Sequence, residues 1–191
     1  MAACVISLKS LLPDCAALTS VAGVRDFGYF CRVADITAVT YATDGSVSAV
    51  TIGTGKLKKF QTRKFQNSGG FDVARNATGK TNFKHLYNAR VYFRSQADRL
   101  ALEQLAIVED LVVFSPNNQS QIEIYGLTIG LTAASGKGST GIKLEDDNTA
   151  LFAFEGVEPK LPILYSTVTT PTTEAADFLA NLVVLDALVG A

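Results

Sequence analysis

The sequence predicts a mainly β protein, a β-sandwich or barrel with one central α-helix and a second helix at the C-terminal end. Three patterns support this fold class: β-branched runs separated by glycine turns, a two-residue alternation in mid-chain, and two stretches of helical periodicity. The chain has 191 residues, of which 48% are apolar and only 18% charged. It is therefore long enough and apolar enough to build a sizeable core.

The N-terminal residues 1–23 are expected to form an arm outside the main domain. This stretch is apolar, but no basic region precedes it, and Lys9 and Pro13 interrupt it. It fits neither a signal peptide nor a membrane span, and no span is expected elsewhere. The cysteines are Cys4, Cys15 and Cys31. An odd count without a Cys-x-x-Cys pair favours reduced thiols over a disulfide between Cys4 and Cys15.

Residues 24–165 are expected to form the β-domain. Two β-branched runs flank an Asp-Gly turn at residues 43–46, which predicts a hairpin over residues 36–52. The clearest strand is predicted over residues 81–94, where side chains alternate between two faces. Residues 66–80 are rich in asparagine, glycine and serine, so a loop is expected there.

The strand over residues 81–94 has one largely apolar face that should meet the core. The residues of this face are Phe83, His85, Tyr87, Ala89, Val91 and Phe93. Shorter β-patterns predict further strands near residues 111–114, 121–125 and 149–154. The domain is therefore predicted to contain several short strands around one long strand.

Two helices are predicted by the spacing of their apolar residues. Ser95 followed by Asp98 is a capping-box pattern, and it opens a helix over about residues 96–109. Residues 166–191 are expected to form a linker and a C-terminal helix of about four turns. The sequence leaves open whether this helix packs on its own domain or on a neighbouring subunit.

The glycine-rich stretch of residues 126–140 has the ending of a phosphate-binding P-loop. A P-loop needs four residues between its two glycines and a Ser or Thr after its lysine. Here five residues separate Gly130 from Gly136, and Gly138 follows Lys137. The stretch also leads into more strand, whereas a P-loop leads into a helix. It therefore predicts a hairpin tip or a bulged strand and not a nucleotide site.

The sequence offers little for catalysis or for metal binding. His85 is the single histidine and lies on the apolar face of the long strand, where a satisfied, partly buried histidine is expected. The acidic run of residues 145–147 lacks the spacing of a calcium loop, so a solvated loop is expected. We therefore expect a protein that is not an enzyme and has no catalytic residues, cofactor or metal.

A basic strand begins at residue 56 and is the one local charge imbalance. Its cations, interleaved with Phe60 and Phe65, are Lys56, Lys58, Lys59, Arg63 and Lys64. A nucleic-acid backbone is one partner for such a pattern. The favoured interpretations are a solvated edge strand, whose lysines discourage aggregation, or a subunit contact that pairs with acids elsewhere.

Five segments follow one another in a characteristic order. They are the hairpin VSAVTIGTGKLKKFQTRKF, the helix SQADRLALEQLAIVED, the strand QIEIYGL, the glycine-rich TIGLTAASGKGSTG and the closing ALFAFEGVEP. In this order they resemble tailed-bacteriophage virion structural proteins of the tail-tube, or major tail, family. The resemblance covers about residues 24–165, and Gly126–Gly141 and Phe154–Pro159 carry most of it.

The resemblance implies a virion structural protein that assembles in the host cytoplasm, most specifically a tail-tube subunit. Proteins of this family fold as a β-sandwich or barrel flanked by a helix. They form hexameric rings whose strands line a DNA channel, and the rings stack through long loops and terminal arms. The implied partners are further copies of the chain, other virion proteins and double-stranded DNA in transit. The alternatives are a capsid decoration or head–tail joining protein, and a small nucleic-acid-binding β-domain.

A channel that passes DNA avoids a strongly basic wall, because counterion release would make the DNA adhere. We therefore expect the basic strand at ring contacts and not in the lumen. The C-terminal helix supplies a second set of candidate contact residues. The residues predicted at the subunit interface are Lys56, Lys58, Lys59, Phe60, Arg63, Lys64, Phe178, Leu182 and Leu185.

Overall fold

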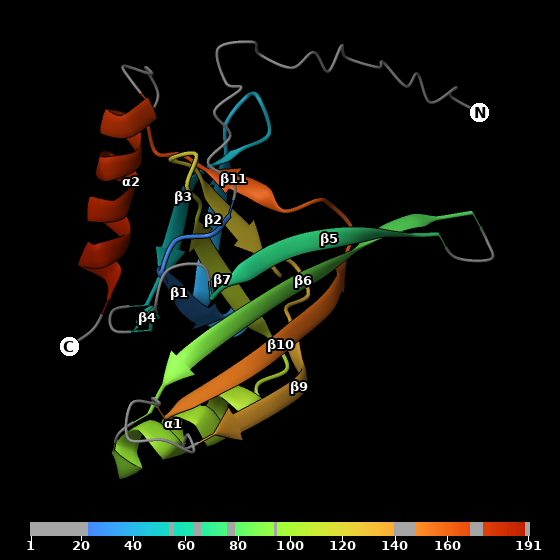
Figure 1. Cartoon of the computed structure of the whole chain (residues 1–191). Coiled ribbons are helices and arrows are strands. Elements are labelled where there is room, and N and C mark those ends of the chain that lie inside the picture. The colour runs from blue at the N-terminus through green and yellow to red at the C-terminus, as the bar shows by residue number, and fades with distance from the viewer. Residues whose placement is uncertain are drawn as a thin grey trace.

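The structure is a computed structural model in which two β-sheets and two α-helices make up most of the chain (Figure 1). It describes residues 23–53, 56–62, 66–75, 79–93, 95–139, 148–168 and 174–189. The first half contains β1 (Phe27–Arg32), the short 3-10 helix η2 (Val33–Asp35), β2 (Ile36–Tyr41), β3 (Val47–Ile52), β4 (Lys58–Gln61), β5 (Ser68–Arg75) and β6 (Thr81–Tyr92). The second half contains α1 (Gln96–Ile107), β7 (Leu111–Pro116), β8 (Ile122–Tyr125), β9 (Thr132–Ser139), β10 (Thr149–Glu158), β11 (Ile163–Tyr165) and α2 (Glu174–Leu188).

The strands form a seven-stranded and a four-stranded sheet. The order in the larger sheet is β2-β3-β11-β8-β7-β1-β4, and in the smaller it is β5-β6-β10-β9. Helix α2 packs on one face of the larger sheet, and the smaller sheet lies against its other face (Figure 1). The sheets are curled, so the architecture is a half-barrel sandwich. The predicted mainly β fold with a central and a C-terminal helix is therefore confirmed.

The first hydrophobic cluster lies between α2 and the larger sheet. Tyr29 of β1, Phe114 of β7 and Ile124 of β8 are buried there against Phe178 and Leu185 of α2. Polar contacts hold the same helix, because the Oδ1 atom of the buried Asn181 accepts bonds from both the backbone N–H and the hydroxyl of Thr167. Helix α2 therefore packs on the sheet of its own chain, which was one of the two possibilities left open by the sequence.

The second cluster lies between the two sheets, and α1 lies at one end of it. Its aromatic members include Phe30, which stacks on Phe60 with ring centroids 4.1 Å apart, and Phe154. Helix α1 has the predicted capping box: the Ser95 hydroxyl accepts from the Asp98 N–H at 3.1 Å, and the Asp98 carboxylate accepts from the Ser95 N–H at 2.8 Å. No residue of α1 is fully buried, so this helix packs loosely.

One predicted loop is a strand. Ser68–Arg75 form β5, which pairs antiparallel with β6 from Ser68 opposite Asn88 to Arg75 opposite Thr81. The prediction of a loop over residues 66–80 was therefore wrong for these eight residues. Its glycines do not mark a turn: Gly69 gives room to the Tyr125 hydroxyl, which would overlap with any Cβ atom at that position. Residues 76–78 lie outside the described part of the chain.

In the part of the chain that the structure describes, no helix combines the length and the apolar composition needed to cross a bilayer. The cysteine Cys31 is buried in the first cluster and is a free thiol. Cys4 and Cys15, and with them the predicted N-terminal arm, lie outside the described residues. The predicted domain boundaries at residues 23 and 165 stay predictions.

Candidate functional site

Residues 58–61 of the predicted basic strand form β4, at one edge of the seven-stranded sheet, and Leu57 just before it bridges to Val189 after α2. Among the described strands, β4 pairs only with β1, in a register that sets Lys59 opposite Tyr29 and Lys58 opposite Phe30. Lys56, Lys58 and Lys59 are exposed, as an edge strand rich in lysine would be. Arg63 and Lys64 lie outside the described residues, so the structure places only part of the predicted cluster.

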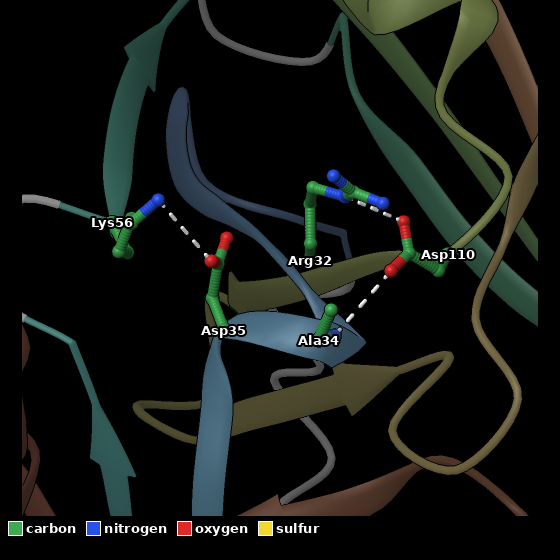
Figure 2. Close-up of polar contacts among 5 residues, drawn as sticks. All are labelled: Arg32, Ala34, Asp35, Lys56 and Asp110. Atoms are coloured by element: carbon green, nitrogen blue, oxygen red, sulfur yellow. Dashed lines mark hydrogen bonds and ion pairs between the residues drawn. The ribbon is translucent and has the colours of Figure 1, made fainter.

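Carboxylates of the same chain face two of these lysines and the neighbouring Arg32. The Lys56 ammonium lies 3.5 Å from an oxygen of Asp35, at the junction between β1 and β2 (Figure 2). In the same view the carboxylate of Asp110 accepts a bond from the Arg32 Nε atom at 2.8 Å and a longer one, 3.4 Å, from the backbone N–H of Ala34. The bond from Arg32 holds the pKa of Asp110 below its usual range.

A third ion pair connects β4 to the C-terminal helix. The Lys59 Nζ atom lies 2.8 Å from the Oδ1 atom of Asp186 in α2, and the Tyr29 hydroxyl donates to the same oxygen at 2.9 Å. Burial of Tyr29, and then its bond to this carboxylate, raise the tyrosine pKa well above its usual value. Two of the three described lysines are thus paired within the chain, which leaves less positive charge for a nucleic-acid backbone.

A groove of about 610 Å³ runs between β4 and α1. Phe30 and Phe60 form part of its apolar lining on the sheet side, and Leu102 and Leu105 form the side that belongs to α1. The charged residues at the groove are Arg32, Asp35, Lys56, Lys58, Lys59 and Asp98. A second hollow of about 490 Å³ lies on the other side of α1, against β9 and β10. Grooves on both sides of α1 agree with its incomplete burial.

The predicted interface residues divide between the surface and the core. Phe60, Phe178 and Leu185 are buried in the core of the chain itself, and Leu182 is partly buried beside the first cluster. Their side chains therefore stabilise the subunit and are not free to meet a neighbour. Lys56, Lys58 and Lys59 remain exposed, and their place at a subunit contact stays a prediction. The apolar spacing of the C-terminal helix did not indicate which of its residues face the core and which face outward.

The glycine-rich stretch does bind an anion, but the anion is a side chain of the same chain. The carboxylate of Glu158 accepts backbone N–H bonds from Thr128 at 3.2 Å, from Ile129 at 2.8 Å and from Gly130 at 3.1 Å. Gly130 has φ of +102°, and a Cβ atom there would lie 2.5 Å from the backbone of Asp110. After this turn the chain continues as β9, with a register shift opposite Ala153 and Phe154 of β10. The predicted bulged strand is therefore confirmed.

His85 connects two loops from the inner face of β6. Its Nε2 atom lies 2.8 Å from the carbonyl oxygen of Lys160, and its Nδ1 atom accepts from the N–H of Gly126 at 3.2 Å. Because the first contact needs a donor and the second needs an acceptor, the ring is neutral with its proton on Nε2. Burial lowers the pKa of His85, although the Lys160 carbonyl and the charge of Glu158 oppose this shift.

Acidification is expected to destabilise the fold through His85. The imidazole in the unfolded chain takes up a proton near its usual pKa of 6.5, whereas the buried ring has a lower pKa. The contribution of neutral His85 is therefore complete above pH 6.5 and is lost as the pH falls through the lower, folded-state pKa. Urea unfolding at about pH 7.5 and about pH 5 should show a larger loss for the wild type than for His85→Gln. Equal losses in both proteins would contradict this role.

Among the elements with exposed large apolar side chains are β5, α1 and α2. Phe71 and Val73 lie on β5, an edge of the four-stranded sheet. Leu100 and Ile107 of α1 are exposed, and so are Leu179, Val183 and Val184 of α2. Such surfaces are typical of proteins that bind other proteins. The sequence analysis did not find them, because exposure depends on which elements the fold leaves uncovered.

The described residues contain no group of three or more His, Cys, Asp or Glu side chains that could hold a metal ion. The polar clusters of the chain are instead pairs and caps: Asp110 with Arg32, Asp186 with Lys59, and Glu158 with backbone amides. Each of them joins segments that are distant in the sequence. Comparisons with models of known protein families, with curated proteins and with solved structures found no match for the chain.

Proposed function

We propose that the chain is a structural subunit that assembles with further copies of itself, most specifically the tail-tube subunit of a phage virion. The observation that supports self-assembly is the four-stranded sheet, whose two edges, β5 and β9, are both eight-residue strands with no further described strand beside them. Unpaired strand edges of this length are templates for pairing with another chain. The specific tail-tube assignment depends on the sequence resemblance.

The side chains of the two edges suit a contact between copies. Strand β5 exposes Phe71 and Val73, the second of them at 64% of its surface. Strand β9 has the sequence TAASGKGS, in which small residues permit a close approach of backbones. A contact from β9 of one copy to β5 of the next is heterologous, and repeated contacts of this kind close into a ring when the rotation permits it.

The proposal predicts rings or stacked tubes of the purified full-length chain in negative-stain electron microscopy. Light scattering should show a mass that is a multiple of the 20.3 kDa subunit. A monomer that persists at high protein concentration would contradict self-assembly. Rings without tubes, or binding only to preformed capsids, would favour the joining-protein or decoration alternative over the tail tube.

The proposed contact between β5 of one copy and β9 of the next can be tested by substitution at the β5 edge. Val73→Lys on β5 is expected to abolish ring formation without unfolding the subunit, because an exposed lysine on a strand edge opposes pairing. The matched control is Val157→Lys, which places the same change at an exposed position of β10, an inner strand of the same sheet. Circular dichroism checks the fold, and sedimentation velocity measures assembly. Rings formed equally well by both variants would exclude the β5 edge as the contact.

A nucleic-acid-binding domain is the alternative from a different functional class. Its test is the affinity for double-stranded DNA as a function of salt, since phosphate contacts make binding weaken steeply with ionic strength. We expect no measurable salt-dependent binding by the wild type, because Lys56 and Lys59 have carboxylate partners within the chain. A steep slope that is lost in Lys58→Ala would favour the nucleic-acid alternative.

A further inference from the structure

Helix α2 has a second apolar face, which its own sheet does not cover. The inner face packs Phe178 and Leu185 into the first cluster. On the opposite side, Leu179 is 61% exposed and Val183 is 69% exposed. The outer face of α2, as we call this surface, consists of Ala175, Ala176, Leu179, Ala180, Val183, Val184 and Ala187, all of them exposed. An exposed apolar surface of this kind is typical of one that contacts another segment or another protein.

The outer face of α2 carries no charged side chain. The helix contains no lysine or arginine. The Asp186 carboxylate is directed to Lys59 and Tyr29, on the side of the helix that meets the sheet. The other acids of the helix, Glu174 and Asp177, are not among the seven residues of the outer face, so an apolar segment can contact these seven residues without covering a charged one.

The first residues that the structure describes, from residue 23 on, lie close to this helix. The guanidinium carbon of Arg25 lies 4.2 Å from the centre of the Phe178 ring, near the beginning of α2. The preceding residue, Val24, bridges to Asn117, and the N–H of Arg25 donates to the carbonyl of Pro116. These contacts fix the backbone at residues 23–25, from which residues 1–22 extend. The side chain of Arg25, two residues after Gly23, reaches α2.

Residues 1–22 have the composition and the length to cover the outer face of α2. Their aliphatic residues are Val5, Ile6, Leu8, Leu11, Leu12, Leu18 and Val21, and their charged residues are Lys9 and Asp14. An extended segment of this length spans roughly 70 Å, at about 3.3 Å per residue. The 15 residues of α2 span only about 22 Å. The segment therefore reaches every part of the helix from its starting point beside Phe178.

We propose that residues 1–22 lie on the outer face of α2 in the same subunit. Aliphatic side chains of the segment then contact Leu179 and Val183 and remove both from water. The tether at residue 23 favours the segment of the same chain over that of another copy, because it keeps the local concentration near the millimolar range. The proposal is independent of the tail-tube assignment, since a monomer also satisfies it.

Crosslinking through the natural cysteines tests the contact in the full-length chain. The test variant is Val183→Cys, and the matched control is Val157→Cys, an exposed valine on β10. A short bis-maleimide can then join the new thiol to Cys4 or Cys15, whereas Cys31 is buried and does not compete. Mass spectrometry of a mixture of ¹⁴N- and ¹⁵N-labelled protein separates links within a chain from links between chains.

We expect crosslinks between position 183 and Cys4 or Cys15 of the same chain. Their yield should be about tenfold above that of the control, because burying one aliphatic side chain shifts a binding equilibrium by about that factor. Links of mixed isotope would overturn the same-subunit placement and assign the face to the segment of a neighbouring copy. Links from 183 to 183 would assign it to a second α2. Equal yields from the two variants would overturn the contact altogether.

Hydrogen exchange gives a second readout that needs no new cysteine. In the double variant Leu179→Gln/Val183→Gln, amides of residues 4–12 should exchange faster than in the wild type, because the surface that protects them has become polar. The control is Val157→Gln, which should leave these amides unchanged. Identical exchange of residues 4–12 in the wild type and in the double variant would contradict the proposal.

Discussion

Glu158→Ala is expected to lower the free energy of unfolding by about 3 kcal/mol, because hydrogen bonds to a charged group contribute about 1.5 to 3 kcal/mol and the buried N–H of Gly130 loses its acceptor. The side chain of Glu158 is only 2% exposed, and its carboxylate is the acceptor for the N–H groups of residues 128–130. Gly130 is packed against the Asp110 backbone, so the turn has little room to rotate these donors towards water. Urea unfolding followed by circular dichroism measures the loss.

Two further variants separate the effect of the hydrogen bonds that Glu158 accepts from residues 128–130 from the effect of its negative charge. Glu158→Gln keeps one acceptor oxygen but removes the negative charge, so its loss should be smaller than that of the alanine variant. Glu155→Ala on the same strand is the control, because Glu155 forms an exposed pair with Lys84 and such pairs contribute below about 1 kcal/mol. A Glu158→Ala protein as stable as Glu155→Ala would show that the amides of the turn do not depend on this carboxylate.

Phe154→Ala is expected to cost about 3 to 5 kcal/mol, the range for truncating a buried phenylalanine. Its side chain is 1% exposed and lies between the two sheets, with ring centroids 5.9 Å from Phe30 and 5.7 Å from Phe152. Removing the ring leaves a cavity at the contact between the sheets, because β-strands fixed by pairing on both sides cannot move in to close it. The midpoint of urea unfolding should fall accordingly.

The same strand supplies the control for this variant. Leu151 lies three residues earlier in β10, on the opposite face, and is 38% exposed. Leu151→Ala should cost below about 1 kcal/mol, as surface substitutions usually do. A similar loss in both variants would mean that the second cluster does not hold the sheets together. An m-value that changes only in Phe154→Ala would instead indicate partial separation of the sheets before global unfolding.

Elements with strong local signals were predicted from the sequence. Strand β6 alternates cleanly because one of its faces meets the core and the other does not, and the buried residues include His85 and Tyr87 as expected. Helix α1 begins at its capping box, and α2 follows its apolar spacing. In each case the pattern results from contacts within a few residues or from one consistently buried face.

Elements defined by distant partners were not predicted. Strand β1 was missed because the larger sheet is covered on both faces, so β1 has buried side chains on both sides and no alternation. Strand β5 contains two glycines and owes its conformation to pairing with β6. The cap on residues 128–130 depends on Glu158, about thirty residues away in the chain. No local pattern in the sequence reports such a contact.

The position of Cys31 makes its thiol a reporter of unfolding. It is the fifth of the six residues of β1 and pairs with Val112 of β7. Burial raises its pKa to about 12, and the charges of Asp35 and Asp110 add to the shift. A thiol that is neither ionised nor accessible reacts with alkylating reagents only after β1 has left the sheet. The rate at which Cys31 is alkylated under native conditions therefore measures how often the seven-stranded sheet opens, without denaturant and without any introduced probe.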